Sequence, residues 1–465
     1  MTIRRDEPKG HALPTRELYC PSHFGNTYEC ALPNEMKALL SEARFWGFNR
    51  FSDWFDTIDL YDVYTGGGGL FNMPEAVWDR KFSNFTCAAE LGFELGLVVT
   101  PNHVFSDQVT AANAAVKDKH IFGQLVCPSK PGVTEIVLAN YRNLFGDFAR
   151  RGLKLASISG GAYDYGGCAC EACQPWIVTF GRLFKQIAEL AKEFFRSLDV
   201  DLWGWWWRDD DHVRFSEWAD REAPGFFNSL AFYLRYGEAR YQVRPVPQGC
   251  KERGFVHIGY GETRGLDTYT HYGPNIAPGR LEATYRFLAE RGADGFLAYS
   301  EGDHDDVNKA ILGGLSSGQF ATADEVLREY ARRHFGGDEA GWCELLREMG
   351  DLGKMDVGRA RALMDRLSPA ARQSWRLQAL EEKIRMAEAD QAARSASRWD
   401  PKRIKAAEAF LAAKERSYRG VWRVGLQRHI FRFDTPGYMP DWYEGYLSAI
   451  GKAPAYRAER ANEEA

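Results

Sequence analysis

The sequence contains no apolar run long enough to cross a membrane, and residues 1–10 are polar and charged. A membrane-spanning helix needs about 20 consecutive apolar residues, and a secretory signal peptide needs an apolar stretch behind a basic start. We therefore expect neither a signal peptide nor a membrane partner. The expected location is the cytoplasm.

The chain also lacks a strong excess of charge of either sign. It has 59 Lys and Arg against 64 Asp and Glu, for a net charge of −5. Nucleic-acid-binding domains are usually basic, so this balance argues against a nucleic-acid partner. No glycine-rich dinucleotide fingerprint follows the first predicted strand, and Gly66 to Gly69 is an isolated glycine run in a long loop. No organic cofactor is expected.

A paired disulfide framework is missing as well, because the nine cysteines are an odd number. Reduced thiols are typical of the cytoplasm. Aromatic residues, by contrast, make up 14% of the chain and include 14 tryptophans. They either fill a core or offer flat faces on which sugar rings stack.

Short apolar runs alternate with segments of helical spacing over the first two-thirds of the chain. The runs predict eight strands, at residues 17–24, 50–55, 97–104, 153–159, 202–207, 229–236, 255–260 and 295–299. Helices are expected between them, among others at 34–48, 78–94, 133–151, 177–197 and 278–291. Polar clusters follow the strands rather than the helices, which favours a closed barrel over an open doubly wound sheet.

The predicted fold class is therefore α/β, a (β/α)8 TIM barrel with a helical C-terminal region. We place the catalytic barrel at residues 1–320. Residues 321–465 are expected to form helices that pack on the barrel. Thr322 and Glu325 are expected to form a capping box at the start of this region.

Three cysteines follow the fourth predicted strand at the close spacing Cys168-x-Cys170-x-x-Cys173. Cys127 lies upstream, before the helix that leads into that strand, and is the expected fourth ligand. Four thiolates would complete a tetrahedral shell, so the expected cofactor is a structural zinc ion that fastens the loop. The alternative is a set of reduced, partly buried thiols.

Carboxylates also follow predicted strands. Hydrolysis of a glycosidic bond needs one carboxyl group as the acid and a second as nucleophile or base. The candidate catalytic residues are Asp164 after the fourth strand, Glu262 after the seventh and Glu301 after the eighth. Further acids of the same rim are Asp53, Asp56, Asp209 and Asp303. Solvated loops collect charge without chemistry, so some of these acids have no catalytic role.

The candidate substrate-binding residues are aromatic, cationic and imidazole side chains of the strand ends: Trp54, Tyr163, Tyr165, Trp205, Trp207, Arg208, Arg264 and His103. Trp205 or Trp207 is a possible sugar platform, and some of the tryptophans at 203–207 must fill the barrel. Arg208 and Arg264 can pair with a substrate carboxylate such as that of a uronic acid, or with neighbouring acids. Histidines in positions such as those of His23, His103 and His257 are more often satisfied rim or core residues than catalysts.

The segment Asp164-x-Gly166-Gly167-Cys168-x-Cys170-x-x-Cys173-x-Pro175-Trp176, with residues 127–129 upstream, resembles a loop of barrel proteins related to α-glucuronidases and β-hexosaminidases. Residues 299–302, 305–309 and 329–336 are similar to the same group. The resemblance implies a glycoside-hydrolase barrel with its site at the strand carboxyl ends. By position, Asp164 matches the loop that bears the acid, and Glu262 and Glu301 match later carboxylates.

The sequence departs from true hexosaminidases at one point. They carry an adjacent Asp-Glu pair after the fourth strand, where this chain has Tyr163-Asp164-Tyr165. This departure argues against the substrate-assisted mechanism on N-acetyl sugars. The expected function is an exo-acting glycosidase on oligosaccharides or glycosides. One alternative is a non-catalytic carbohydrate-binding barrel. Another is a sugar lyase or metal-dependent isomerase that uses His103 or His257 with Asp303 and Asp305. The C-terminal helices either mediate a homo-oligomer or close the barrel.

Overall fold

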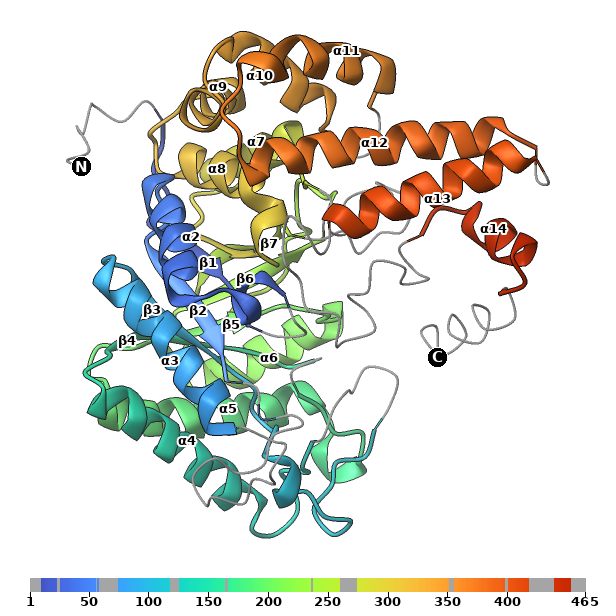
Figure 1. Cartoon of the computed structure of the whole chain (residues 1–465). Helices are drawn as coiled ribbons and strands as arrows, with labels where there is room; N and C mark the ends of the chain where they lie inside the picture. The colour runs from blue at the N-terminus through green and yellow to red at the C-terminus, as the bar shows by residue number, and fades with distance from the viewer. Residues whose placement is uncertain are drawn as a thin grey trace.

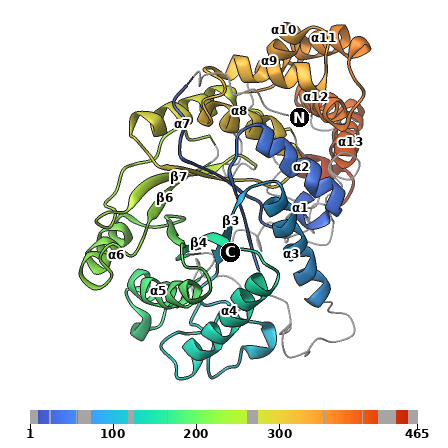
Figure 2. The ribbon, with the colours of Figure 1, turned by 90° about the vertical axis from the view of Figure 1, so that its left-hand side faces the viewer.

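Eight parallel strands form a closed barrel in sequence order, with β1 pairing to β8 (Figures 1 and 2). The computed structural model describes residues 10–22, 26–55, 57, 74–117, 125–163, 166–235, 237–259, 274–350, 355–397, 400–417 and 439–452. The predicted (β/α)8 barrel with a helical C-terminal region is confirmed. Among the described helices, none is both long and apolar enough to cross a membrane.

The strands are β1 (Thr15–Tyr19), β2 (Arg50–Trp54), β3 (Glu94–Val99), β4 (Leu155–Gly161), β5 (Asp199–Trp203), β6 (Ser229–Leu234), β7 (Lys251–His257) and β8 (Gly295–Tyr299). The helices of the barrel are α1 (Thr27–Cys30), α2 (Pro33–Phe45), α3 (Pro74–Glu90), α4 (Val133–Arg150), α5 (Trp176–Phe194), α6 (Asp209–Glu222), α7 (Pro278–Glu290) and α8 (Asp306–Ser316). Short 3-10 turns are η1 (Ser106–Gln108), η2 (Glu171–Cys173) and η3 (Asp303–Asp305).

The C-terminal region continues with α9 (Ala323–His334), α10 (Glu339–Glu348), α11 (Val357–Leu367), η4 (Ser368–Ala370), α12 (Trp375–Ser395), α13 (Pro401–Glu415) and α14 (Tyr443–Ala449). Helices α12 and α13 lie side by side (Figure 1). The side chain of Thr322 caps α9 by accepting from the Glu325 amide, as expected. The Glu325 carboxylate, however, accepts from the Ala321 amide, one residue before the expected position.

Hydrogen bonds from three side chains attach these helices to the barrel. Arg376 of α12 donates to Asp306 at the start of α8, and the Tyr330 hydroxyl of α9 donates to the same carboxylate. Lys383 of α12 donates to the Pro274 carbonyl at 2.8 Å. The domain boundary near residue 320 stays a prediction.

Several strands begin earlier than the apolar pattern predicts. The fifth was expected at 202–207 and runs over Asp199–Trp203, and the seventh was expected at 255–260 and runs over Lys251–His257. The reason is that Asp201 and Arg253 lie inside these strands as buried charges, at 4% and 5% exposure. A charged residue ends an apolar run in the sequence, although here it belongs to the strand.

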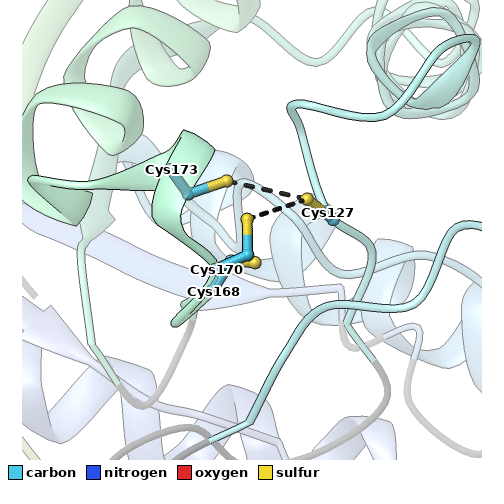
Figure 3. A group of neighbouring side chains, drawn as sticks. All are labelled: Cys127, Cys168, Cys170 and Cys173. Carbon is cyan, nitrogen blue, oxygen red and sulfur yellow. Dashed lines mark hydrogen bonds between the residues drawn. The ribbon is translucent and has the colours of Figure 1, made fainter.

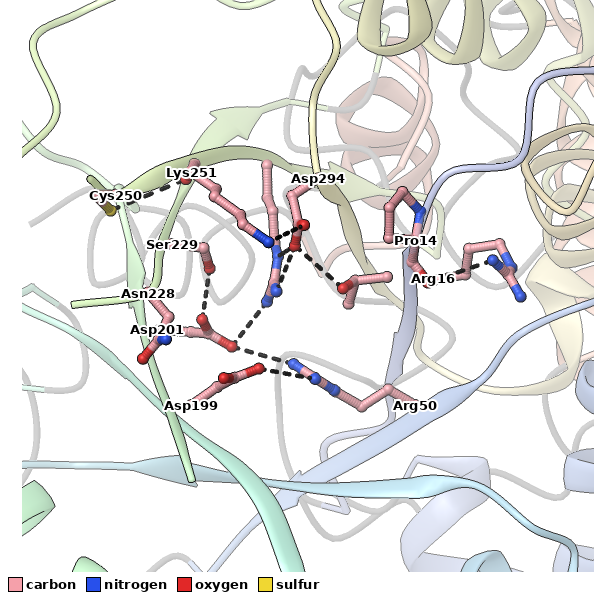
Figure 4. A network of polar contacts seen from close by, with 12 residues as sticks. Pro14, Arg16, Arg50, Asp199, Asp201, Asn228, Ser229, Cys250, Lys251 and Asp294 are labelled. Carbon is pink, nitrogen blue, oxygen red and sulfur yellow. Dashed lines mark hydrogen bonds and ion pairs between the residues drawn. The ribbon is translucent and has the colours of Figure 1, made fainter. Parts of the chain in front are cut away.

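These charges form an ionic network at the amino-terminal end of the barrel (Figure 4). Asp201 accepts from Arg50 of β2 at 3.2 Å and from Arg253 of β7 at 2.8 Å. Arg253 continues to Asp294, just before β8, at 2.6 Å. The network joins strands that are not neighbours in the sheet. Breaking one partner of such a buried pair typically costs about 3–5 kcal/mol.

Aromatic residues fill the barrel above this network. These residues form a cluster separate from the main core, which lies between the strands and the helices. With its aliphatic members the cluster consists of Tyr19, Trp54, Val98, Trp203, Trp205, Ala231, Phe255, Leu297 and Tyr299. The expectation that some of the tryptophans at 203–207 fill the barrel is met by Trp203, which is fully buried. The barrel thus has a charged lower layer and an aromatic upper layer.

Glu17 provides a test of the lower layer. It lies opposite Arg50 in the β1–β2 register, and burial raises its pKa although Arg50 opposes the shift. A raised folded-state pKa stabilises the protein below the unfolded pKa, and this contribution is lost as pH rises through the folded value. Glu17→Gln should therefore gain stability over the wild type with rising pH, by up to about 1.4 kcal/mol per pH unit between the two pKa values.

The measurement is urea unfolding of both proteins between pH 4 and pH 8. Glu90→Gln, at the exposed end of α3, is the matched control and should follow the wild type at every pH. A constant difference between Glu17→Gln and the wild type across this range would contradict the proposed cause.

Candidate active site and cysteine cluster

Glu301 lies at the carboxyl end of β8 and is 1% exposed. Its two oxygens accept hydrogen bonds from different elements: Oε2 from the Asn26 side-chain amide at 3.0 Å, and Oε1 from the Tyr299 hydroxyl. Its backbone amide donates to Asp305 at 2.9 Å. These contacts fix the carboxylate in one orientation. Asn26 is 275 residues away in the sequence, so no local pattern indicated it.

A chain of stacked rings leads from Glu301 across the barrel mouth. The Tyr299 ring stacks on His257 at 4.8 Å between centroids, and His257 stacks on Trp205 at 5.0 Å. Trp205 then stacks on Trp206 at 5.7 Å. Trp205 is only 6% exposed, so it supports Trp206 from within the barrel. Trp206 itself is half-buried and faces a cleft.

Four candidate residues, Asp164, Tyr165, Glu262 and Arg264, lie outside the described residues. So do His23 and Asp56. Tyr163, at the edge of this gap, donates from its hydroxyl to Asp211 at 2.9 Å. Asp211 also accepts from the Arg208 backbone amide at 2.8 Å, and burial raises its pKa. Asp211 therefore orients Tyr163, a role hidden in the sequence by the acidic run at 209–211.

Two acids of the rim hold the backbone instead. Asp53 is fully buried and accepts from the amide and hydroxyl of Ser22 at 2.9 and 2.7 Å, which joins the end of β2 to the segment after β1. Asp305 accepts from the Ser300 hydroxyl and forms an ion pair with Lys309 at 2.9 Å. Neither offers an open carboxylate to a substrate. Trp54, next to Asp53, is 4% exposed and packs in the aromatic layer.

His103 follows β3 and is buried. Both ring nitrogens lack a hydrogen-bond partner among the described residues, and burial lowers its pKa to about 3. The imidazole is therefore neutral at physiological pH. The other histidine of the predicted set, His257, is fully buried in the stacked chain.

A cleft of about 800 Å³ opens beside the barrel mouth, next to the ends of β4, β5 and β6. The predicted residues Tyr163, Trp207 and Arg208 line it, together with Trp206 and Tyr233. Its outer wall is the segment between β6 and β7, where residues 237–250 contain no helix. Barrel units normally carry a helix at this position. Three arginines of this wall were not anticipated, because they belong to a loop without apolar periodicity: Arg235, Arg240 and Arg244.

The four predicted cysteines come together (Figure 3). The sulfur atoms of Cys127, Cys168, Cys170 and Cys173 all lie within 4.8 Å of one another, and Cys127 is 3.6 Å from both Cys170 and Cys173. A tetrahedral zinc–thiolate centre places its sulfurs about 3.8 Å apart, since each Zn–S bond is about 2.3 Å. This group of thiols has the composition and spacing to hold a metal ion.

Asn102, just after β3, connects the cluster to the barrel. Its side chain donates to the carbonyls of Val126 and Gly167 at 2.9 and 2.8 Å and accepts from the Gly167 amide at 3.0 Å. A Cβ atom at Gly166 would lie 2.9 Å from Asn102 Oδ1, and Gly167 has φ +153°. The two glycines of the motif are therefore needed for this close approach.

Comparison with solved structures gives a likeness to the O-GlcNAc hydrolase of Thermobaculum terrenum. The TM-score is 0.51 at 10% identity, over 95% of this chain and 97% of that one. The fold is one that a glycoside hydrolase uses. A β-amylase catalytic domain from Paenibacillus polymyxa matches at TM-score 0.43 and 9% identity, over 66% of this chain and 99% of that one.

A GH5_18 protein of Streptomyces cattleya, solved in complex with Manb1-4GlcNAc, matches at TM-score 0.43 and 11% identity, over 77% of this chain and 92% of that one. The sequence matches no protein-family model and no curated protein. At these identities the likeness concerns the fold alone. The reaction has to be argued from the side chains.

Proposed function

We propose that this protein is a glycoside hydrolase, an exo-acting glycosidase on oligosaccharides. The observation that carries the proposal is Glu301. It is a buried carboxylate at the carboxyl end of a barrel strand, where barrel enzymes hold their catalytic groups, and stacked rings connect it to an aromatic cleft. The fold shared with an O-GlcNAc hydrolase is compatible with this reaction.

Glu301 is proposed as nucleophile or base, because its two hydrogen-bond donors stabilise the charged form. Asp164 or Glu262 would be the general acid, and Glu262 is also an alternative for the role of Glu301. Retention of the anomeric configuration needs carboxyl groups about 5 Å apart, and inversion needs about 6.5–9.5 Å.

Substrate sugars are proposed to stack on Trp206 and Trp207, whose half-buried rings line the cleft. Tyr163, Tyr165, Arg208 and Arg264 would contact sugar hydroxyl or carboxylate groups. Trp54, Trp205 and His103 are buried, and any part they play is to support the residues above them.

One observation favours a second candidate, a non-catalytic carbohydrate-binding barrel. Both oxygens of Glu301 already accept hydrogen bonds. In this second function the carboxylate would have a purely structural role, which is to hold Asn26 and the segment after β1 in place. Such a protein would bind saccharides in the cleft without cleaving them.

Replacement of Glu301 separates the two functions. Glu301→Gln keeps the shape of the side chain but removes its charge, so turnover of the aryl glycoside that the wild type cleaves should fall at least about 100-fold. The measurement is nitrophenol release from a panel of aryl α- and β-glycosides that includes glucuronides and N-acetylhexosaminides.

Glu290→Gln, exposed at the end of α7, is the matched control and should retain the wild-type rate. A silent panel with the wild-type enzyme, combined with saccharide binding, would support the binding barrel. If Glu301→Gln cleaves the glycoside as fast as the wild type does, Glu301 is not a catalytic residue.

We further propose that Cys127, Cys168, Cys170 and Cys173 bind a structural zinc ion. Burial raises the pKa of Cys127 and Cys173, and metal binding would oppose this effect because it favours the thiolate forms. With four sulfur ligands the ion would have no open position for a substrate. Its role would be to hold the loop between Tyr163 and α5.

Metal content tests this site. The wild type is purified in the presence of zinc and dialysed against a weak chelator. It should then contain roughly one zinc ion per chain, measured by inductively coupled plasma mass spectrometry. Cys168→Ser should lose the ion and unfold at a lower temperature. Cys87→Ser, on α3, is the control because it also removes a thiol but lies outside the cluster. Equal zinc content in Cys168→Ser and Cys87→Ser would refute the assignment.

A further inference from the structure

The cleft beside the barrel mouth has an unusual concentration of arginine. Four arginines line it, Arg208, Arg235, Arg240 and Arg244, against one lining carboxylate, Glu238. The whole chain has a net charge of −5, so this positive surface is local and does not reflect the overall composition. We propose that the cleft binds an extended polyanionic saccharide. This inference specifies the substrate class of the proposed glycosidase, although the binding itself does not depend on turnover.

Three of the arginines form no ion pair with any acid in the described part of the chain, although Arg208 lies near enough to Asp211 to oppose the rise of its pKa. Among the described residues, Arg208, Arg235 and Arg240 form no ion pair, and all three are exposed. Arg244 alone is paired, with Asp209 at 2.6 Å. Elsewhere on the surface exposed arginines do have partners, such as Arg142 with Glu193 and Arg286 with Glu282. The unpaired guanidinium groups of the cleft therefore have free donors for anionic oxygens.

Aromatic faces hold two of these guanidinium groups. Arg235 lies over the Tyr233 ring at 5.9 Å, and Arg240 lies over the Phe287 ring at 5.8 Å. Stacking on a ring restricts the side chain while the N–H groups at its edge remain available, so less entropy is lost when an anion binds. The arginines are thus partly preorganised for a ligand.

Flat rings lie beside the charges. Trp206 and Trp207 line the same cleft, and Trp206 has φ +55°, a conformation that a bulky residue adopts rarely. Backbone strain of this kind tends to occur where a side chain has to be presented in a particular direction. Here it places the Trp206 ring between buried Trp205 and the cleft. Rings for sugar faces beside cations for acidic groups match a charged carbohydrate.

The distribution of the arginines favours a chain with repeated charges over a single acidic group. Arg208 precedes α6, Arg235 follows β6, and Arg240 and Arg244 belong to the segment before β7. One carboxylate has two oxygens and satisfies only one or two guanidinium groups. Anionic groups repeated along a saccharide would engage all three segments. The anion is a carboxylate or a sulfate, since both match the planar donor edge of arginine.

The test measures binding without requiring turnover. Wild-type protein is titrated by calorimetry with polygalacturonate, which bears carboxylates, with chondroitin sulfate, which also bears sulfates, and with neutral dextran. Binding to one or both charged polymers and not to dextran is expected, and the tighter of the two identifies the preferred anion. Raising the salt concentration should weaken this binding because it screens the exposed charges.

The variant Arg208→Gln/Arg240→Gln should bind the charged polymer about tenfold or more weakly, because it lacks two guanidinium groups that donate charge-assisted hydrogen bonds to the anionic groups. Arg196→Gln is the matched control. Arg196 is also exposed, but it lies between α5 and β5, at the opposite end of the barrel. The control should bind as the wild type does.

The inference would be overturned by a lack of binding to both charged polymers, by equal affinity for dextran and the charged polymers, or by equal weakening in Arg196→Gln. It would also be overturned by tighter binding of a single-stranded DNA oligonucleotide than of either polysaccharide. The last would indicate a general polyanion surface. Charged polymers that bind without any glycoside being cleaved would leave the inference intact and refute the hydrolase. Cleavage of neutral glycosides by a protein that binds no charged polymer would support the hydrolase and refute the inference.

Discussion

The buried ionic network at the amino-terminal end of the barrel is the constraint on which the rest of the structure depends. Asp201 of β5 accepts from Arg50 of β2 and Arg253 of β7, so three strands that are not neighbours in the sheet are fixed relative to one another. Desolvated charges tolerate little displacement, because each must keep its partner. With the lower end fixed in this way, the upper end of the barrel can hold aromatic rings and functional groups that contribute less to closure.

The division between the two ends explains the arrangement of the candidate site. Glu301 and the cleft are at opposite ends of a row of stacked rings from Tyr299 to Trp206, and the rings transmit position because packed aromatic side chains have few alternative rotamers. The segment between β6 and β7 has no helix in its described part, and its arginines form the outer wall of the cleft. The buried carboxylate and the charged cleft are therefore connected through a row of packed rings.

The sequence predicts the fold well, because each of the eight strands overlaps one of the eight predicted segments. It misplaces the start of β5 and β7, since inward-facing Asp201 and Arg253 look like loop residues until their partners are known. The cysteine cluster could be predicted because three of its members have the close sequence spacing that is typical of metal ligands. The contact of Asn26 with Glu301 and that of Asp211 with Tyr163 could not be found, because each joins residues far apart in the chain. The arginines of the cleft follow no periodicity.

The position of the cysteine cluster along the chain has a consequence for assembly. Cys127 and Cys173 enclose a segment that contains α4 and β4, and all four thiols precede β5. During synthesis the complete ligand set therefore leaves the ribosome before the second half of the barrel exists. A metal ion captured at that stage would close a long loop and reduce the conformational entropy of the nascent half-barrel. It would also hold β3 and β4 together, through Asn102, while the later strands are still being made.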